Sequence, residues 1–255
     1  MYDPIRLEVC VDSVASAMAA EQGGADRLEL CSNLAEGGTT PSGGLIAMVR
    51  KQVTIDLRVL IRPRAGDFCY SPDEFDVMRR DVLLAKQLGV DGVALGILDA
   101  NGNVDITRTR DLVKLAHPLQ VTFHRALDMA RDLNAALEAV LETGCDRILT
   151  SGAAHTAEHG IETIARLVTS ASGRIHIVAA GGIRENNVRS IIEKAGVREV
   201  HAALQTSIPS PMRFRNETTT MGTIRSDEYQ RFVVNSETVA KLIEAAGEGV
   251  RATRQ

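Results

Sequence analysis

The sequence predicts a (β/α)8 barrel, in which eight parallel strands close into a ring and a helix follows each strand. Two observations predict this fold. A short phrase, GADRLEL at residues 24–30, recurs as GVDGVAL at 89–95 and GCDRILT at 144–150, and more loosely as GVREVHA at 196–202. Four further strand candidates alternate with these copies: Arg6–Val11, Leu57–Ile61, Leu119–Phe123 and Ile175–Ala179. Eight short strand–helix units in 255 residues are typical of this barrel.

Helical patterns follow the strands in order. We expect helices over Ser13–Gln22, Gly43–Lys51, Pro72–Leu88, Ile106–His117, Asn134–Thr143, Glu158–Ser172, Glu185–Ala195 and Ser236–Ala246. The glycine that opens each copy of the phrase can adopt the left-handed conformation that ends a helix. The alternative, an open doubly wound sheet, usually has a glycine-rich loop after its first strand, whereas this chain has Val11-Asp12-Ser13 there. We therefore predict a single TIM-barrel domain over residues 1–255.

A long irregular segment, Gln205–Arg225, follows the eighth predicted strand. It is polar, contains Pro209 and Pro211, and is too long for a simple turn. We expect it either to cover the barrel mouth or to reach a neighbouring subunit.

The composition argues against several classes of partner. The net charge is −4, aromatic residues make up 3% and tryptophan is absent, so no nucleic-acid partner is expected. No run of about 18 apolar residues occurs, so no membrane span is expected. The first residues carry neither a cationic start nor an apolar signal core, which predicts a cytoplasmic or nuclear protein. The four cysteines are expected as thiols, and the lack of a Cys-x-x-Cys pair argues against structural zinc.

The first two predicted strands carry nearly the same phrase, LEVC at residues 7–10 and LELC at 28–31. Because strand side chains alternate between faces, Glu8 and Cys10 share one face, as do Glu29 and Cys31. The carboxyl ends of the strands form the site of such a barrel. We therefore expect two carboxylates and two thiols to converge there.

The paired thiols of Cys10 and Cys31 allow two interpretations. Thiolates prefer soft ions, and Cu(I) accepts two sulfur ligands, so the pair could hold Cu(I). Alternatively, free cysteines often pack as small hydrophobic residues with no further role.

The buried carboxylates also allow two interpretations. Glu8 and Glu29 are candidate catalytic residues for acid–base chemistry, or ligand-binding groups. They could instead serve structure by pairing with arginines inside the barrel, since an isolated buried charge is costly. The arginines expected within reach are Arg62, Arg64 and Arg125.

Polar residues that follow the later strands would face the same mouth. His124, after the fifth strand, is a third candidate catalytic residue. The candidate ligand-binding residues are Arg62, Arg64, Arg125, Asp128, Ser151, Gly181, Gly182 and His201. Gly181 and Gly182 follow the seventh strand, where phosphate-binding barrels place part of their phosphate site.

These residues carry a resemblance to the CutC copper-homeostasis family. The matching motifs are LEVCVDS (7–13), GGADRLELCS (23–32), EGGTTPS (36–42), IRPRAGDF (61–68), VTFHRALDM (121–129), LTSG (149–152) and MRFRN (212–216). They span nearly the whole chain in order, and the opening resembles animal members more than bacterial ones. The chain departs from its relatives at Ala203, where they often carry serine, which puts any role for a hydroxyl there in doubt.

The resemblance implies a (β/α)8 barrel that forms homo-oligomers in the cytoplasm and, in animals, also in the nucleus. It also implies copper handling, with Cys10 and Cys31 matching the cysteines proposed to hold Cu(I) in animal relatives. The first hypothesis is therefore a copper-binding protein.

The second hypothesis is an enzyme acting on a small anionic metabolite, which could be phosphorylated. Glu8 or Glu29 would transfer the proton, and Arg62 and Arg64 would clamp the anion. A third interpretation is an oligomeric scaffold that assembles through Gln205–Arg225.

Overall fold

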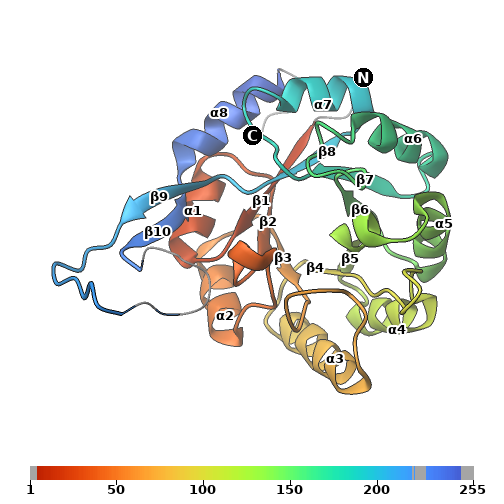
Figure 1. The fold of residues 1–255 in the computed structure, drawn as a ribbon, viewed down its shortest axis with the longest axis horizontal. Coiled ribbons are helices and arrows are strands. Elements are labelled where there is room, and N and C mark those ends of the chain that lie inside the picture. The colour runs from red at the N-terminus through yellow and green to blue at the C-terminus, as the bar shows by residue number, and fades with distance from the viewer. Residues whose placement is uncertain (1–4, 220, 222–227, 248–255) are drawn as a thin grey trace.

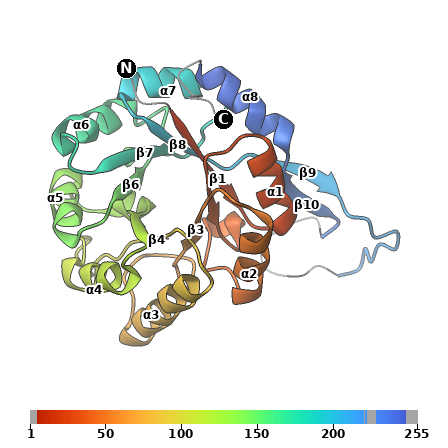
Figure 2. The ribbon, with the colours of Figure 1, turned by 180° about the vertical axis from the view of Figure 1, so that it is seen from behind.

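Eight parallel strands close into a barrel in the order of the chain in the computed structural model, which describes residues 5–219, 221 and 228–247 (Figure 1 and Figure 2). The strands are β1 (Arg6–Val11), β2 (Arg27–Leu30), β3 (Asp56–Leu60), β4 (Gly92–Leu95), β5 (Gln120–Phe123), β6 (Arg147–Thr150), β7 (His176–Ala180) and β8 (Glu199–Ala202). Pairing between β8 and β1 closes the ring and places Glu8 opposite His201. The predicted barrel is confirmed.

A ring of helices covers the outer face of the strands (Figure 1). The helices are α1 (Val14–Gln22), α2 (Gly43–Gln52), α3 (Pro72–Gln87), α4 (Ile106–Ala116), α5 (Leu133–Thr143), α6 (Ile161–Ala171), α7 (Val188–Ala195) and α8 (Ser236–Ala246). Helix α3 begins with a capping box between Ser71 and Glu74. Gly144 and Gly196 end α5 and α7 at φ angles of 85° and 71°, the left-handed conformation predicted for them. Among the described helices, none combines the length and apolar character needed to span a bilayer.

The amino-terminal half of the barrel interior is filled by paired charges. Arg27, Arg58 and Arg147 lie there and are each no more than 5% exposed. Glu199 accepts hydrogen bonds from Arg27 at 2.5 Å and from Arg147 at 3.0 Å, and Gln120 bridges Arg58 and Arg147. Buried charges of this kind are tolerated because each has a partner. The network fills the amino-terminal half of the barrel interior. Among the described residues, the open cavity lies toward the carboxyl ends of the strands.

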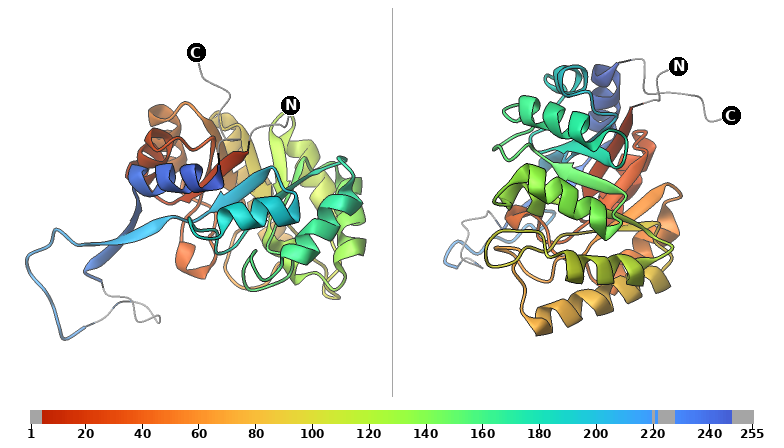
Figure 3. Two further views of the ribbon diagram at one scale, coloured as in Figure 1. Left: turned by 90° about the horizontal axis from the view of Figure 1, so that it is seen from above. Right: turned by 90° about the vertical axis from the view of Figure 1, so that its right-hand side faces the viewer.

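A two-stranded arm follows the barrel. Strands β9 (Gln205–Pro209) and β10 (Gln230–Val234) pair antiparallel, and the described chain between them extends away from the barrel (Figure 1 and Figure 3). The predicted irregular segment Gln205–Arg225 therefore begins as a strand, while residues 220 and 222–225 of it lie outside the described residues. Of its described residues, Gln205 at the start of β9 lies at the barrel mouth, and the following part of the segment extends away from the barrel. We define residues 205–219 and 228–234 as the arm.

Candidate functional site

A cavity of about 430 Å³ opens at the carboxyl ends of the barrel strands. The predicted site residues that line it are Cys10, Glu29, Arg62, His124, Arg125, Asp128, Gly181, Gly182 and His201. Four other predicted residues do not line it: Glu8, Cys31, Arg64 and Ser151. The remaining wall is largely apolar and is formed by Leu34, Leu60, Phe68, Met129, Leu149 and Ala180, with Gly37, Arg184, Ala203 and Gln205 at other points.

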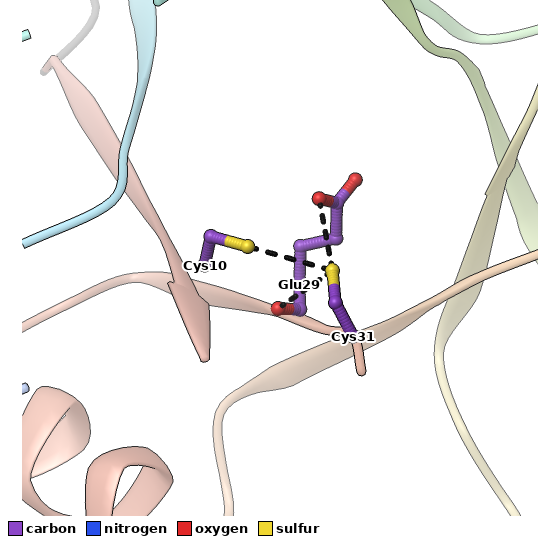
Figure 4. Close-up of side chains that lie close together, drawn as sticks. All are labelled: Cys10, Glu29 and Cys31. Carbon is purple, nitrogen blue, oxygen red and sulfur yellow. Dashed lines mark hydrogen bonds between the residues drawn. The ribbon is translucent and has the colours of Figure 1, made fainter. Parts of the chain in front are cut away.

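The thiols of Cys10 and Cys31 lie side by side, with their sulfur atoms 3.4 Å apart (Figure 4). Cys10 stands opposite Glu29 in the β1–β2 register, and the N–H of Cys31 donates to the carbonyl of Val11 at 2.9 Å. The Cys31 sulfur also lies 3.5 Å from a Glu29 carboxyl oxygen. One ligand atom from each of Cys10, Glu29 and Cys31 lies within 4.8 Å of the others. The predicted convergence of the two thiols is confirmed.

The two thiols differ in acidity. The hydrogen bond with Cys31, helped by the hydrogen bond and charge of His201, outweighs burial and lowers the pKa of Cys10 to about 6. The same hydrogen bond with Cys10, together with burial, raises the pKa of Cys31 well above its usual value. Near neutral pH the pair therefore carries one thiolate, on Cys10, which accepts a hydrogen bond from Cys31. Only the Cys10 thiolate faces the cavity.

Glu8 is held by partners other than the predicted ones. The sequence suggested pairing with Arg62, Arg64 or Arg125, but Glu8 pairs with Arg27 and accepts a hydrogen bond from His201 at 2.6 Å. Burial alone would raise the pKa of Glu8, but the charge of Arg27 and the bond with His201 outweigh it and lower that pKa. Glu8 is thus a buried anion below the cavity floor, and it fixes the orientation of the His201 ring.

The pKa of Glu29 is shifted in the opposite direction from that of Glu8. Burial raises the pKa of Glu29 to about 8, and its nearest cation is His201, with 3.9 Å between Nε2 and the carboxylate. Burial alone would lower the pKa of His201, but the charge of Glu29 and the hydrogen bonds with Cys10 and Glu8 raise it. A protonated His201 therefore joins Glu8 to the thiols and to Glu29. Cys10, Glu29 and His201 all line the cavity.

His124 presents a hydrogen-bond donor with no acceptor. Its Nδ1 accepts the N–H of Ala126 at 3.2 Å, and its buried Nε2 has no partner among the described residues. Burial, and then the charge of Arg62, lower the pKa of His124 to about 3, so the ring is neutral. A neutral imidazole that accepts at Nδ1 carries its proton on Nε2. The ring lines the cavity, although the Nε2 atom itself is covered by neighbouring protein atoms.

Arg125, Asp128 and Ser151 form one hydrogen-bonded group after β5 and β6. Arg125 donates to Asp128 at 2.7 Å and to Ser151 at 2.8 Å. Asp128 also accepts from Thr150 and from the N–H of Ser151. A Cβ placed on Gly181 would lie 3.5 Å from a terminal nitrogen of Arg125, so the guanidinium lies against the loop after β7. Ser151 holds Arg125 in place from behind the cavity wall.

Two arginines differ from the predicted set of cavity residues. Arg64 donates to Glu74 at 2.6 Å and to Asp67 at 3.1 Å, so it holds the loop after β3 and lies away from the cavity. Arg184 lines the cavity but was not predicted. Arg184 directly follows Gly181-Gly182-Ile183, the predicted phosphate loop, and this position is the sequence feature that could have indicated it.

Comparison with known proteins gives consistent matches along the chain. Residues 5–206 match the model of the CutC family. A CutC family protein from Bacteroides thetaiotaomicron is 48% identical over 242 residues, which cover 94% of this chain and 97% of the relative. The human copper homeostasis protein cutC homolog is 44% identical over 244 residues, covering 96% of this chain and 89% of the relative.

Solved structures match in the same way. The crystal structure of CutC from Streptococcus agalactiae superposes with a TM-score of 0.73 at 33% identity, covering 77% of this chain and 97% of that one. Phosphoribosylanthranilate isomerase from Thermotoga maritima superposes with a TM-score of 0.58 at 13% identity, covering 95% of this chain and 98% of that one. The second similarity extends to the barrel fold alone.

Proposed function

Because the chain belongs to the CutC family, we propose that it is a copper-homeostasis protein that binds Cu(I) between the thiols of Cys10 and Cys31. The observation that carries this proposal is the 3.4 Å separation of the two sulfur atoms. Two sulfur atoms this close on rigid neighbouring strands need little rearrangement to share one ion. The human and mouse relatives carry copper homeostasis in their names, which supports the same function.

The chemistry of the donor set fits Cu(I). Soft thiolate ligands select Cu(I) over harder divalent ions, and two thiolates suffice for it. Cys10 is already a thiolate near neutral pH, so only Cys31 must lose its proton when the ion binds. Glu29 is the third potential ligand atom within 4.8 Å, but its carboxylate is a hard donor that suits other ions better. The two sulfur ligands, without Glu29, account for the expected preference for Cu(I).

The position of the pair supports exchange of the ion with the outside. Cys10 lines the open cavity, whereas Cys31 lies behind it and is 1% exposed. An incoming ion would meet the Cys10 thiolate first and then the Cys31 thiol. Leu60 and Ala94 pack around the pair, so it is shielded from bulk water on its other side.

Substitution of the thiols tests this proposal. We expect reduced protein to take up about one Cu(I) per chain in competition with a chromophoric Cu(I) chelator under anaerobic conditions. Cys10→Ser and Cys31→Ser should each weaken binding by at least about tenfold, or ~1.4 kcal/mol, because one of two ligands is lost. Cys69→Ser is the matched control, since Cys69 is an exposed thiol away from the cavity. Unchanged affinity in the Cys10→Ser, Cys31→Ser double variant would remove the proposal.

We further propose a cytoplasmic homo-oligomer, with the nucleus as a second compartment. Free paired thiols persist in reducing compartments, which supports this location. Exposed Met212, Phe214 and Phe232 on the arm support assembly with a second copy of the chain. Imaging of a fluorescent fusion tests the location, and exclusive recovery in the secreted fraction would contradict it.

A further inference from the structure

The cavity carries more positive charge than its own carboxylates balance. Arg62 and Arg184 both line it, and in the described part of the chain neither forms an ion pair with a carboxylate. Arg62 donates to the backbone carbonyl oxygens of Glu36, Gly38 and Gly66, at 2.9, 2.7 and 2.8 Å. Arg184 donates to those of Ile183 and Ala203, at 2.7 and 3.2 Å. Carbonyl dipoles orient a guanidinium but leave its net charge in place. A cavity that holds two unbalanced cations is suited to an anionic ligand.

A buried donor without a partner indicates where a ligand oxygen would bind. His124 is 4% exposed and its ring lines the cavity, while its covered Nε2–H has no acceptor among the described residues. Buried polar groups in native proteins are nearly always hydrogen-bonded, so an orphan of this kind requires an explanation. An acceptor oxygen on a bound molecule would satisfy it after a small turn of the ring toward the cavity. This donor is neutral, so it suits an uncharged oxygen as well as an anionic one.

The loop after β7 provides a surface on which an anion can approach the backbone. Gly181 and Gly182 line the cavity with φ angles of 95° and 69°, and a Cβ on Gly182 would lie 2.8 Å from Thr156. Only glycine fits such positions without strain, so the backbone is left uncovered there. Arg125 lies against Gly181, and Arg184 follows two residues after Gly182. In (β/α)8 barrels this region, after the seventh and eighth strands, frequently forms a phosphate site.

The remaining wall indicates the nature of the rest of the ligand. A volume of about 430 Å³ is in the range of small-molecule sites, and it exceeds what a bare phosphate ion would fill. Leu60, Phe68 and Leu149 give part of the cavity wall an apolar surface. A small organic body therefore fits between them.

We propose that the cavity binds a small organic phosphate monoester, with its phosphate at Arg125, Gly181–Gly182 and Arg184 and an oxygen of its organic part accepting from His124 Nε2. The inference goes beyond copper binding and does not depend on it, because none of these residues is a thiol. Arg62 adds charge at the other side of the cavity. The ligand would lie above Cys10, so its binding and that of copper are expected to influence each other.

Calorimetric titration of full-length protein tests the proposal, with copper removed by a chelator and reductant present. The probe is ribose 5-phosphate, with ribose and inorganic phosphate as comparison ligands. We expect saturable binding of the ester, weaker binding of phosphate, and none of ribose. His124→Asn keeps an acceptor for the Ala126 N–H but removes the Nε2 donor, and we expect it to weaken ester binding about tenfold. Arg184→Gln should weaken both the ester and phosphate by a similar factor.

The controls separate a specific site from general charge effects and from the copper proposal. Arg189→Gln removes one charge on α7, where Arg189 is exposed and paired with Glu193, and should leave binding unchanged. Cys31→Ser removes a proposed copper ligand that does not line the cavity and should retain ester binding, so loss of copper binding and loss of ester binding are distinguishable. Melting curves confirm folding, and Arg125→Gln replaces Arg184→Gln if that variant does not fold. No saturation with the ester up to about 10 mM, phosphate binding as tightly as the ester, or an equal loss in Arg189→Gln would overturn the proposal.

Discussion

Glu8 and Glu29 occupy equivalent positions in the two copies of one phrase, yet the fold gives them opposite charge states. Glu8 contacts Arg27 and His201, and these cations keep it ionised despite complete burial. Glu29 has no contact shorter than 3.9 Å to a cation among the described residues, so burial dominates and keeps it protonated at neutral pH. Of the two, only Glu29 lines the cavity, so the protonated carboxyl group is the one that a bound molecule would meet.

The acidity of Cys10 leads to a prediction for the pH dependence of its reactivity. The thiolate is the reactive form of cysteine, and the pKa of Cys10 lies near 6 while that of Cys31 is raised. In a Cys69→Ser background, alkylation of Cys10 by iodoacetamide should rise through about pH 6 and level off above about pH 7. Peptide mass spectrometry checks which thiol carries the label. Cys31 and Cys145 should remain largely unlabelled.

Two variants locate the cause of this acidity. Cys31→Ala removes the hydrogen-bond donor of Cys10, and His201→Gln removes a nearby charge, so each should shift the alkylation profile of Cys10 to higher pH. Cys145→Ala is the control. Cys145 precedes β6, at the end of the strand away from the cavity, where its sulfur accepts a hydrogen bond from Thr143. A Cys10 rate in the parent protein that keeps rising to about pH 9 would show an ordinary thiol and contradict the prediction.

The sequence indicated which side chains converge at the barrel mouth better than it indicated their partners. Strand alternation alone places Glu8 with Cys10 and Glu29 with Cys31, so the convergence of the thiols was predictable. The partner of Glu8 was not, because His201 lies 193 residues away and meets it only where β8 closes on β1. The arginines below the cavity were missed for a related reason. Arg27 and Arg147 begin their strands and Arg58 lies in the middle of β3, and a charged residue ordinarily indicates solvent.

At the scale of elements, the packing of α1 against α8 depends on one glycine. A Cβ placed on Gly23 would lie 2.6 Å from the carbonyl oxygen of Ser236 and 2.6 Å from Val239 Cβ. Its φ of −73° is open to any residue, so only the close approach of α8 requires glycine here. We expect Gly23→Ala to lower the free energy of unfolding by about 1–3 kcal/mol, because backbone atoms must move. Urea denaturation measures the change.

A second glycine provides the matched control for that prediction. Gly44 lies inside α2, and a Cβ there would meet nothing closer than Ser42 Oγ at 3.9 Å. Gly44→Ala should therefore raise the free energy of unfolding by up to about 1 kcal/mol through helix propensity alone. Equal effects of the two substitutions would show that the α1–α8 contact is not tight.

The order of the strands and helices was predictable from the repeated phrase. The residues at which the helices begin and end were harder to predict. Glycines that open the phrase do end helices, at Gly144 and Gly196. Helices α6 and α7 begin at Ile161 and Val188, later than predicted, because turns occupy the polar residues before them. Turn and helix residues have similar composition in such stretches, so periodicity alone cannot separate them.

At the scale of the whole molecule, the arm is the feature that the barrel does not explain. Met212, Phe214 and Phe232 are between 56% and 73% exposed, and the arm extends away from the barrel (Figure 3). The hairpin pairing of β9 and β10 was not predicted, because Pro209 and Pro211 argue against a strand in sequence. Exposed apolar side chains that gather on a projecting hairpin are typical of a surface that binds another protein.

We therefore expect the wild-type chain to self-associate and an arm variant to lose that association. Phe214→Ser combined with Phe232→Ser removes the two exposed aromatic side chains of the arm without touching the barrel. Light scattering after size exclusion should give a multiple of 27.5 kDa for the wild type and 27.5 kDa for the variant. Leu83→Ser on α3 is the control, because Leu83 is 46% exposed on a helix away from the arm, and it should leave the mass unchanged. A monomeric wild type at about 10 µM would contradict the proposed assembly, since interfaces of ordinary size hold at that concentration.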